Sequence, residues 1–303
     1  VSIYPNMFDE EYYKKVLVRH FLPFLNQEIG AILKEEGTKS YVYYRYPEKY
    51  LKSGNLNPIF PHHVIRYELL QEHRAEIIFG FTEEGVYIGR TYAVDDPNFK
   101  RKLDEERPHS EYKSSIPPKL AIMMLNFLDL FQQRREKKVL DPFVGNGTIP
   151  LFASLQGFEV YGSDVSGEKV ENSVKNIVWL YRELGFQETT QVQLEKRFRE
   201  IKIENLRREF GENAFDGICT EPRLGPFFTE KPYYPQVRDL LDDTIEPLYD
   251  TIFKEAKKVL KPGSRMSIIA PIINTMDGGD LQINVEKIAR AHKFKQIPLV
   301  DPK

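Results

Sequence analysis

Cysteine, long apolar runs and a strong net charge are all scarce in this sequence of 303 residues. Its single cysteine, Cys219, excludes an internal disulfide framework and a cysteine-rich zinc site. No apolar run approaches the roughly 20 residues that cross a membrane, and the first residues lack the charged and then apolar order of a secretory signal. The net charge of −2 means that any grip on nucleic acid must come from local basic patches. We therefore expect a soluble cytoplasmic protein with no membrane partner.

The chain is predicted to contain two domains joined by a linker. Residues 1–94 combine a helical region over Asp9–Glu36 with a hairpin that turns at Glu84-Gly85, which predicts a small α+β domain. Residues 95–119 are polar, charged and proline-bearing, and proline biases its predecessor away from a helix, so this segment has the chemistry of a linker. In residues 120–303, strand and helix patterns alternate, which predicts a parallel sheet with helices on both faces.

The alternation in the second domain predicts its individual elements. The expected strands are Lys138–Leu140, Phe158–Gly162, Gln191–Leu194, Phe215–Thr220 and Arg265–Ala270. The expected helices are Leu120–Leu128, Gly167–Leu184 and Leu240–Leu260, and a turn at Lys261–Gly263 follows the last of them. Ser166 is a candidate N-cap of the second helix, and Gly185 is its candidate stop.

The segment Val139–Thr148 is predicted to be a strand that ends in an acid and turns through two glycines into a helix. Glycine lets the backbone approach a ligand closely at such a turn. S-adenosylmethionine has no phosphate and carries a sulfonium and an ammonium group, so the Asp141 carboxylate favours its binding electrostatically. The candidate cofactor contacts in this segment are Asp141, Phe143, Gly145, Gly147 and Thr148.

Two other interpretations of this turn stay open. It can be a tight connection with no ligand, since two glycines alone are a weak signal. A nicotinamide dinucleotide is disfavoured, because Asp141 would repel its pyrophosphate and Pro150 stands where a third glycine is wanted.

The next predicted strand also ends at an acid, Asp164. A carboxylate at the end of the second strand can accept both hydroxyls of a ribose, as it does in nucleotide-binding folds. Its other possible role is helix capping, which Ser166 can perform instead. Adenine is then expected to lie between Val165 and a residue after the third strand, for which Glu195 is the candidate.

Further segments carry a resemblance to a known family. Glu221-Pro222-Arg223-Leu224 follows a strand at the place where amino-methyltransferases carry an acid or amide, two prolines and an aromatic residue. More narrowly, the chain resembles the THUMP-containing tRNA guanine-N2 methyltransferases over most of Glu76–Pro271. The resemblance includes Asp141–Thr148 and Asp164, and its lead-in segments are Ile88–Thr91, Asp95, Arg107-Pro108 and Ile116–Ala121. It implies a Rossmann-like class I methyltransferase domain behind a THUMP-like, RNA-binding domain.

The resemblance also implies a mechanism. The Glu221 carboxylate and the Pro222 carbonyl would accept the hydrogens of an exocyclic amino group, orient its nitrogen and ease the loss of a proton. The segment that contains Pro117 would close over the cofactor. Arg223 and Leu224 complete the tetrapeptide but replace its second proline and its aromatic residue. The residues that could supply the missing ring are Phe227, Phe228, Tyr233 and Tyr234.

The leading interpretation is a methyltransferase that acts on an exocyclic amino group of a nucleic-acid base, with guanine N2 in tRNA as the first candidate. A DNA adenine or cytosine amino-methyltransferase is the main alternative. A catalytically silent protein that binds RNA or activates a partner subunit is the other, because Arg223 and Leu224 depart from the motif. A valine at position 1 and an end soon after Phe294–Val300 are typical of a fragment.

Basic residues occur in two groups. Arg107, Lys113 and Lys119 in the linker are candidate phosphate contacts. The second group is interleaved with acids and is better explained as a solvated helix face: Lys196, Arg197, Arg199, Lys202, Arg207 and Arg208. The histidines show no metal-ligand spacing, so no metal is expected.

Overall fold

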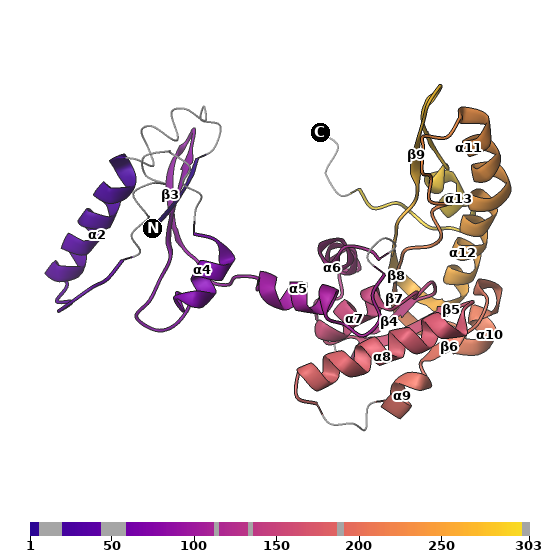
Figure 1. Ribbon diagram of the computed structural model, residues 1–303, viewed down its shortest axis with the longest axis horizontal. Coiled ribbons are helices and arrows are strands. Elements are labelled where there is room, and N and C mark those ends of the chain that lie inside the picture. Colours follow the sequence, from indigo (N-terminus) through magenta and orange to yellow (C-terminus); the bar gives the residue numbers. More distant parts are fainter. Residues whose placement is uncertain (6–19, 44–58, 112–114, 133–135, 187–190, 299–303) are drawn as a thin grey trace. The chain divides into compact units, whose positions relative to one another are not determined.

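The computed structural model describes residues 1–5, 20–43, 59–111, 115–132, 136–186 and 191–298 (Figure 1). Their contacts divide the chain into two compact units, Val1–Arg101 and Lys102–Lys303. The division falls inside the segment for which linker chemistry was predicted. That segment is not wholly irregular, because it contains helix α5 (Pro97–Glu105), in which Leu103 is fully buried. No helix among the described residues is both long and apolar enough to cross a membrane.

The first unit contains a three-stranded sheet with helices. Its elements are β1 (Ser2–Pro5), α2 (Leu22–Glu35), α4 (Pro61–Arg66), β2 (Ile77–Thr82) and β3 (Gly85–Arg90). The predicted hairpin is confirmed, since β2 and β3 are antiparallel, and β1 adds to β2 in parallel. Ile3, Phe79 and residues of α2 form the core of this unit. The amino-terminal part of the helix predicted over Asp9–Glu36 lies largely outside the described residues, and α2 is the part described.

The second unit is built on a five-stranded parallel sheet. Its strands are β4 (Lys138–Asp141), β5 (Glu159–Asp164), β6 (Phe198–Glu200), β7 (Phe215–Thr220) and β8 (Leu260–Ile268). Their order in the sheet is β6-β5-β4-β7-β8, so the chain reverses direction across the sheet between β4 and β7. This is the Rossmann-like class I methyltransferase fold. In such a sheet, ligands bind outside the carboxyl ends of the strands at the point of reversal.

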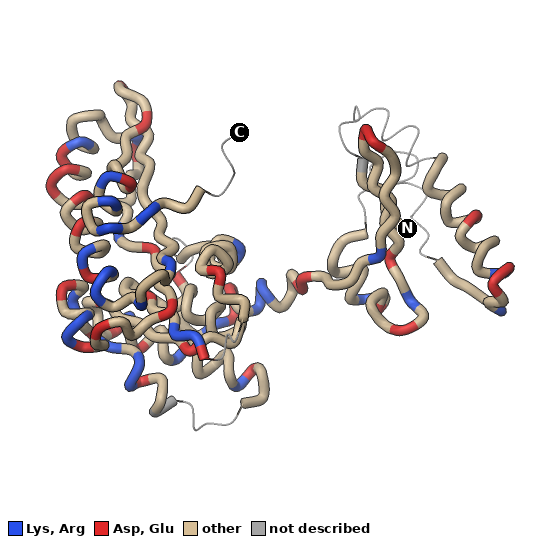
Figure 2. Tube along the Cα trace, turned by 180° about the vertical axis from the view of Figure 1, so that it is seen from behind, with Lys and Arg blue, Asp and Glu red and all other residues tan. Residues whose placement is uncertain are grey.

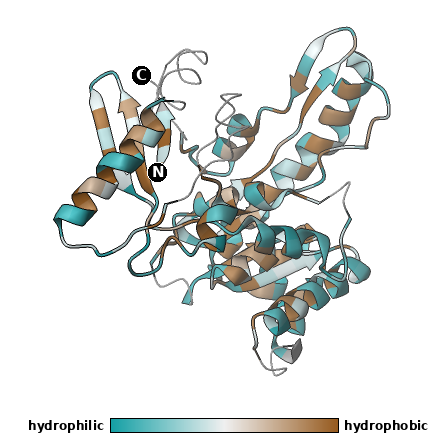
Figure 3. Ribbon diagram, turned by 60° about the vertical axis from the view of Figure 1, so that its left-hand side comes forward, coloured by the Kyte–Doolittle hydropathy of each residue, from teal (hydrophilic) through white to brown (hydrophobic). Residues whose placement is uncertain are grey.

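Helices cover both faces of this sheet. They are α6 (Pro118–Asn126), α7 (Thr148–Leu155), α8 (Gly167–Glu183), α9 (Gln191–Glu195), η4 (Ile203–Asn205), α10 (Leu206–Phe210), α11 (Tyr234–Leu240), the π-turn η5 (Leu241–Ile245), α12 (Glu246–Val259) and α13 (Val285–Ala291). Helix α7 packs against both α6 and α8, and α12 packs against both α10 and α13. The sheet lies between these two layers of helices (Figure 1). Apolar residues concentrate between the layers (Figure 3).

Two predicted boundaries of α8 agree with the structure. The Lys169 backbone N–H donates to Ser166 Oγ at 3.4 Å, so Ser166 is the N-cap. Gly185 has a φ of +78° and stands just after the end of the helix. Because Ser166 caps the helix, Asp164 is not needed as its N-cap.

The predicted third strand is wrong. Residues 191–195 form helix α9, and the edge strand β6 comes three residues later. Leu194 is buried as a residue of α9, and the buried Phe198 is the first residue of β6. The predicted Leu240–Leu260 helix is helical as far as Val259, with the π-turn η5 within it. The predicted turn at Lys261–Gly263 falls within β8, where the pairing with β7 shifts register between Leu260 and Arg265 and Gly263 has a φ of +80°.

A hairpin that the sequence did not predict follows the sheet. It consists of β9 (Ile272–Thr275) and β10 (Gly279–Gln282), which are antiparallel.

The segment Arg107–His109, called the strap below, belongs to the second unit and is held to helix α7 by a buried arginine. Arg107 donates to Thr148 Oγ1 at 2.8 Å and to Ser115 Oγ at 3.1 Å, and its side chain is almost fully buried. Burial lowers the pKa of Arg107, while the Asp104 charge at 3.8 Å raises it. The prediction that Arg107 contacts phosphates is therefore wrong, because its guanidinium is enclosed beside the first residue of α7.

Asn176 joins the strap to the glycine turn. Its Nδ2 donates to the His109 carbonyl at 2.7 Å and to the Asn146 carbonyl at 2.8 Å, and its Oδ1 accepts from the His109 N–H at 3.0 Å. The side chain is fully buried on α8. Three segments distant in sequence are thus fixed by one amide.

Replacing Asn176 by alanine is predicted to destabilise the protein by about 2 kcal/mol, because partly buried backbone groups of His109 and Asn146 lose their partners. Asn172 is the matched control on the same helix, since its described hydrogen bond to Asn146 is long, at 3.5 Å. Urea unfolding of Asn176→Ala and Asn172→Ala measures the difference. Equal losses of stability would show that Asn176 does not hold the strap.

Candidate functional site

Three carboxylates gather at the carboxyl ends of neighbouring strands. Asp141 ends β4, Asp164 ends β5, and Glu221 directly follows β7. Because β4 lies between β5 and β7, Asp141 stands in the middle of this acidic edge. The sequence predicted all three residues for the site. The arrangement gives a negative potential at the point where the sheet order reverses.

Asp141 is the most constrained of these acids. It is only 3% exposed, and its Oδ1 accepts from the Thr220 hydroxyl at 2.7 Å and from the Phe143 N–H at 3.1 Å. Burial raises the pKa of Asp141 to about 7, the two hydrogen bonds oppose this rise, and the charges of Asp164 and Glu221 add to it. A cation beside Asp141 would reverse this shift. Thr220 was not predicted for the site, and only its place at the strand end signals its role.

Asp164 connects the glycine turn to the end of β5. Its Oδ2 accepts from the Gly145 N–H at 3.0 Å, and its Oδ1 accepts from the Ser166 N–H at 3.1 Å. An ionised carboxylate has about four acceptor positions, so capacity remains for further donors. The neighbouring Val165 is 67% exposed and presents an apolar side chain beside this carboxylate.

The turn itself depends on its second glycine. Gly147 has a φ of +84°, and a Cβ built on it would lie 2.4 Å from Ser173 Oγ on α8. Gly145 has a φ of +50° with open space around it. Phe143 packs against the buried core, and the Thr148 hydroxyl accepts from Arg107. The backbone of the turn, more than these two side chains, faces the acidic edge.

The first two residues of the tetrapeptide Glu221–Leu224, which follows β7, are shielded from solvent in part or in full. Glu221 is half-buried and burial raises its pKa, Pro222 is buried, Arg223 is exposed, and Leu224 is half-buried. Tyr249 of α12 is fully buried, and this burial raises the pKa of its hydroxyl. The charge of Glu221 also raises this pKa, so Tyr249 lies near the start of the tetrapeptide. The Tyr249 hydroxyl donates to the Ile269 carbonyl at 2.6 Å. This tyrosine was not predicted, because only the fold brings α12 beside the tetrapeptide.

The aromatic residues that follow the tetrapeptide are exposed. Phe227 is 83% exposed, and the others are also accessible: Phe228, Tyr233 and Tyr234. Their loop is fastened to the unpredicted hairpin, because the Tyr234 N–H donates to Asp277 Oδ1 at 2.7 Å and the Met276 N–H donates to the Pro232 carbonyl at 3.0 Å. These rings therefore stand outside the core on a supported loop.

Two predicted cofactor contacts stand on elements other than the strands of the acidic edge. Glu195 is exposed at the end of α9, before β6, whereas Glu200 is the β6 residue paired with Asp164. The misplaced third strand accounts for this difference. Pro117 is the exposed residue before α6, and the preceding Ile116 is buried.

The arginines of the second basic group are paired with acids, and Arg199 also contacts a ring. Arg197 pairs with Glu159 at 3.1 Å, and Arg199 lies 5.0 Å from the centre of the Phe210 ring. Arg207 and Arg208 pair with Glu212 and Glu209. These residues extend over β6 and α10, so they do not form one helix face as predicted. Basic and acidic residues alternate over the helices of this unit (Figure 2). Among the described residues, no cluster of three or more histidine, cysteine or acidic side chains could hold a metal ion.

Comparisons with known proteins find methyltransferases. No protein-family model matches the chain. It is 26% identical over 158 residues to a tRNA (guanine(10)-N2)-dimethyltransferase of Pyrococcus abyssi, covering 51% of this chain and 41% of that protein. It is also 26% identical over 166 residues to the Methanothermobacter thermautotrophicus protein of the same name, covering 48% and 47%. The chain thus spans less than half the length of these curated relatives.

Among solved structures, the chain is similar to TrmN from Thermus thermophilus, with 20% identity and a TM-score of 0.40. The match covers 76% of this chain and 58% of that one.

Replacing Asp141 by asparagine is predicted to stabilise the protein at alkaline pH. An unfolded aspartate ionises near pH 4, whereas folded Asp141 does so at about 7, so wild-type stability falls between these values as pH rises. The advantage of Asp141→Asn should therefore grow by about 2–3 kcal/mol between about pH 5 and about pH 8. Urea unfolding at both pH values measures it. A difference that does not change with pH would contradict the raised pKa.

Proposed function

We propose that this chain binds S-adenosylmethionine at the acidic edge and transfers its methyl group. The observation that carries the proposal is the buried Asp141, whose pKa is raised to about 7 at the end of β4. Such a site repels a phosphate and favours a cation. When bound, S-adenosylmethionine supplies an electrophilic methyl group on a positively charged sulfur.

The residues around the turn fit this cofactor. Asp141 provides the charge that complements its cationic groups, and Asp164 retains acceptor capacity for ribose hydroxyls. Val165 offers an exposed apolar side chain to the adenine. Gly145 and Gly147 keep the backbone open beside the ligand. In this proposal, the strap and Asn176 hold the turn in its shape.

The proposed substrate is the exocyclic amino group of a nucleic-acid base, with guanine N2 in tRNA as the first candidate. Glu221 and the Pro222 carbonyl accept the hydrogens of that group and orient its nitrogen, and Glu221, whose pKa burial raises, is suited to take a proton. An exposed ring such as Phe227 supports the base after it leaves its stack. The names of the two curated relatives favour tRNA.

The first unit is proposed to be a THUMP-like RNA-binding domain, and the protein is proposed to act in the cytoplasm. A DNA amino-methyltransferase remains the alternative substrate class. A silent protein that works with a partner subunit is the alternative without catalysis, and Arg223 and Leu224 of the tetrapeptide are the reason to test it.

Cofactor binding is predicted to release a proton from Asp141 below about pH 7, because the positive ligand favours the ionised carboxylate. Affinity should therefore rise with pH and level off above that value. Calorimetry in buffers of different ionisation enthalpy measures the proton release, and Asp141→Asn should bind more weakly without releasing this proton. Binding by the parent chain with no proton exchange would contradict the proposal for Asp141.

Methyl transfer is predicted to reach unmodified tRNA and to give N2-methylguanosine on digestion. Labelled S-adenosylmethionine is offered in parallel to tRNA and to duplex DNA. Glu221→Gln should lower kcat by about a hundredfold or more, since proton removal is lost, while cofactor affinity changes far less.

Glu230→Gln is the matched control, because Glu230 is an exposed residue of the same loop. Label only in DNA would replace tRNA with the alternative substrate. Cofactor binding without transfer to either nucleic acid would favour the silent protein.

A further inference from the structure

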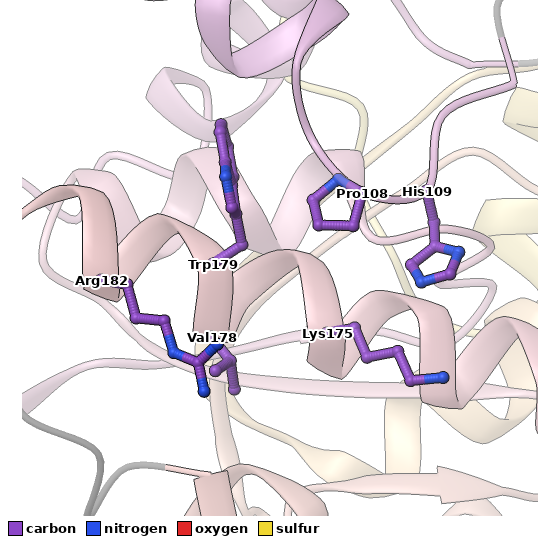
Figure 4. Close-up of a pocket in the computed structure, with 6 residues that line it drawn as sticks. All are labelled: Pro108, His109, Lys175, Val178, Trp179 and Arg182. Atoms are coloured by element: carbon purple, nitrogen blue, oxygen red, sulfur yellow. The ribbon is translucent and has the colours of Figure 1, made fainter.

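A cavity of about 250 Å³ lies in the second unit, between the strap and the outer face of α8. It is lined by Pro108, His109, Lys175, Val178, Trp179 and Arg182 (Figure 4). The four α8 residues follow an i, i+3, i+4, i+7 pattern, so they lie on one side of the helix. The cavity does not include any of the carboxylates of the acidic edge.

The walls of this cavity are fixed by the buried contacts of the strap. Arg107 holds the strap to Thr148, and Asn176 holds both backbone polar groups of His109. Lys175 directly precedes Asn176 on α8 and Val178 follows two residues later, so the same helix turn that supports the strap also lines the cavity. A preorganised site loses little conformational freedom when it binds a ligand.

The lining combines flat rings with cations. Trp179 is the only tryptophan of the chain and is half-buried, and the Pro108 and His109 rings lie along the same stretch of the helix (Figure 4). Lys175 and Arg182 are both exposed. Lys175 pairs with Glu171 at 2.7 Å, but both side chains are about half-exposed, and such surface pairs are weak enough to exchange for a phosphate.

From this lining we infer that the cavity binds an unpaired nucleotide of an RNA substrate. Its base stacks on Trp179, and its phosphates contact Lys175 and Arg182. Stacking on an aromatic side chain together with cationic contacts is how proteins hold single-stranded nucleic acid. The inference rests on the proposed RNA substrate. Besides the contact with the target base, the cavity would give the RNA a second contact, which holds a nucleotide flanking that base beside the strap.

The unique tryptophan provides the test, because its fluorescence reports on this cavity alone. A single-stranded oligoadenylate is predicted to quench the Trp179 emission of the full chain, with an affinity that falls as salt rises. Trp179→Ala should weaken oligoadenylate binding about fivefold or more, measured with a labelled oligonucleotide. Trp179→Phe should keep most of the affinity, since it keeps a ring.

Arg182→Gln is a second variant that does not alter the ring, and it should weaken binding and reduce the salt dependence. Its matched control is Arg290→Gln on α13, which removes the same charge from an exposed helix pair with Glu286. Lack of quenching by oligoadenylate would overturn the inference. So would unchanged affinity in both Trp179→Ala and Arg182→Gln, or quenching by an acidic peptide where oligoadenylate has no effect.

S-adenosylmethionine binding is measured separately by calorimetry on the same variants and should match that of the parent chain. A variant that loses oligoadenylate binding but keeps cofactor binding is impaired at the cavity and not at the proposed cofactor site. A parent chain that binds oligoadenylate but no cofactor would instead contradict the proposed function.

Discussion

The burial of one carboxylate at the carboxyl end of β4 is the constraint on which the site depends. Removing Asp141 from water, with a smaller contribution from the neighbouring acids on β5 and after β7, raises its pKa to about 7. If the charge of Asp141 had no function, an asparagine at this position would make the folded protein more stable. The fold keeps the acid at the point where ligands bind in such sheets, and in the proposed function this placement favours a cationic ligand.

The glycine turn that faces Asp141 is stabilised from the opposite side. The buried residues Arg107 and Asn176 connect it to the strap through hydrogen bonds, and Gly147 allows the close approach of α8. The strap follows the segment in which the two units divide, and its other surface lines the cavity that contains Trp179. One set of contacts therefore supports both the proposed cofactor site and the inferred RNA contact.

Much of the sheet could be predicted from the sequence, because β4, β5 and β7 contain apolar residues and each ends at or directly before an acidic residue. Asp141, Asp164 and Glu221 were placed together for the same reason, since parallel strands end at one edge. Strand β6 was missed because it has three residues, and β1 because its partner is 76 positions away in the chain, so neither carries a local pattern.

Other features depend on tertiary structure. The enclosure of Arg107, the contacts of Asn176 and the place of Tyr249 follow from how helices pack on the sheet. Glu195 was chosen for the site because its segment resembled a strand, and its placement changed when that segment proved to be a helix.

The most direct test of the account is the titration of Asp141 itself, followed by NMR of its carboxyl carbon. The account predicts a pKa of about 7 in the free protein and a much lower value when S-adenosylmethionine is bound. A pKa near that of an ordinary aspartate in the free protein, or one that the cofactor does not change, would contradict it.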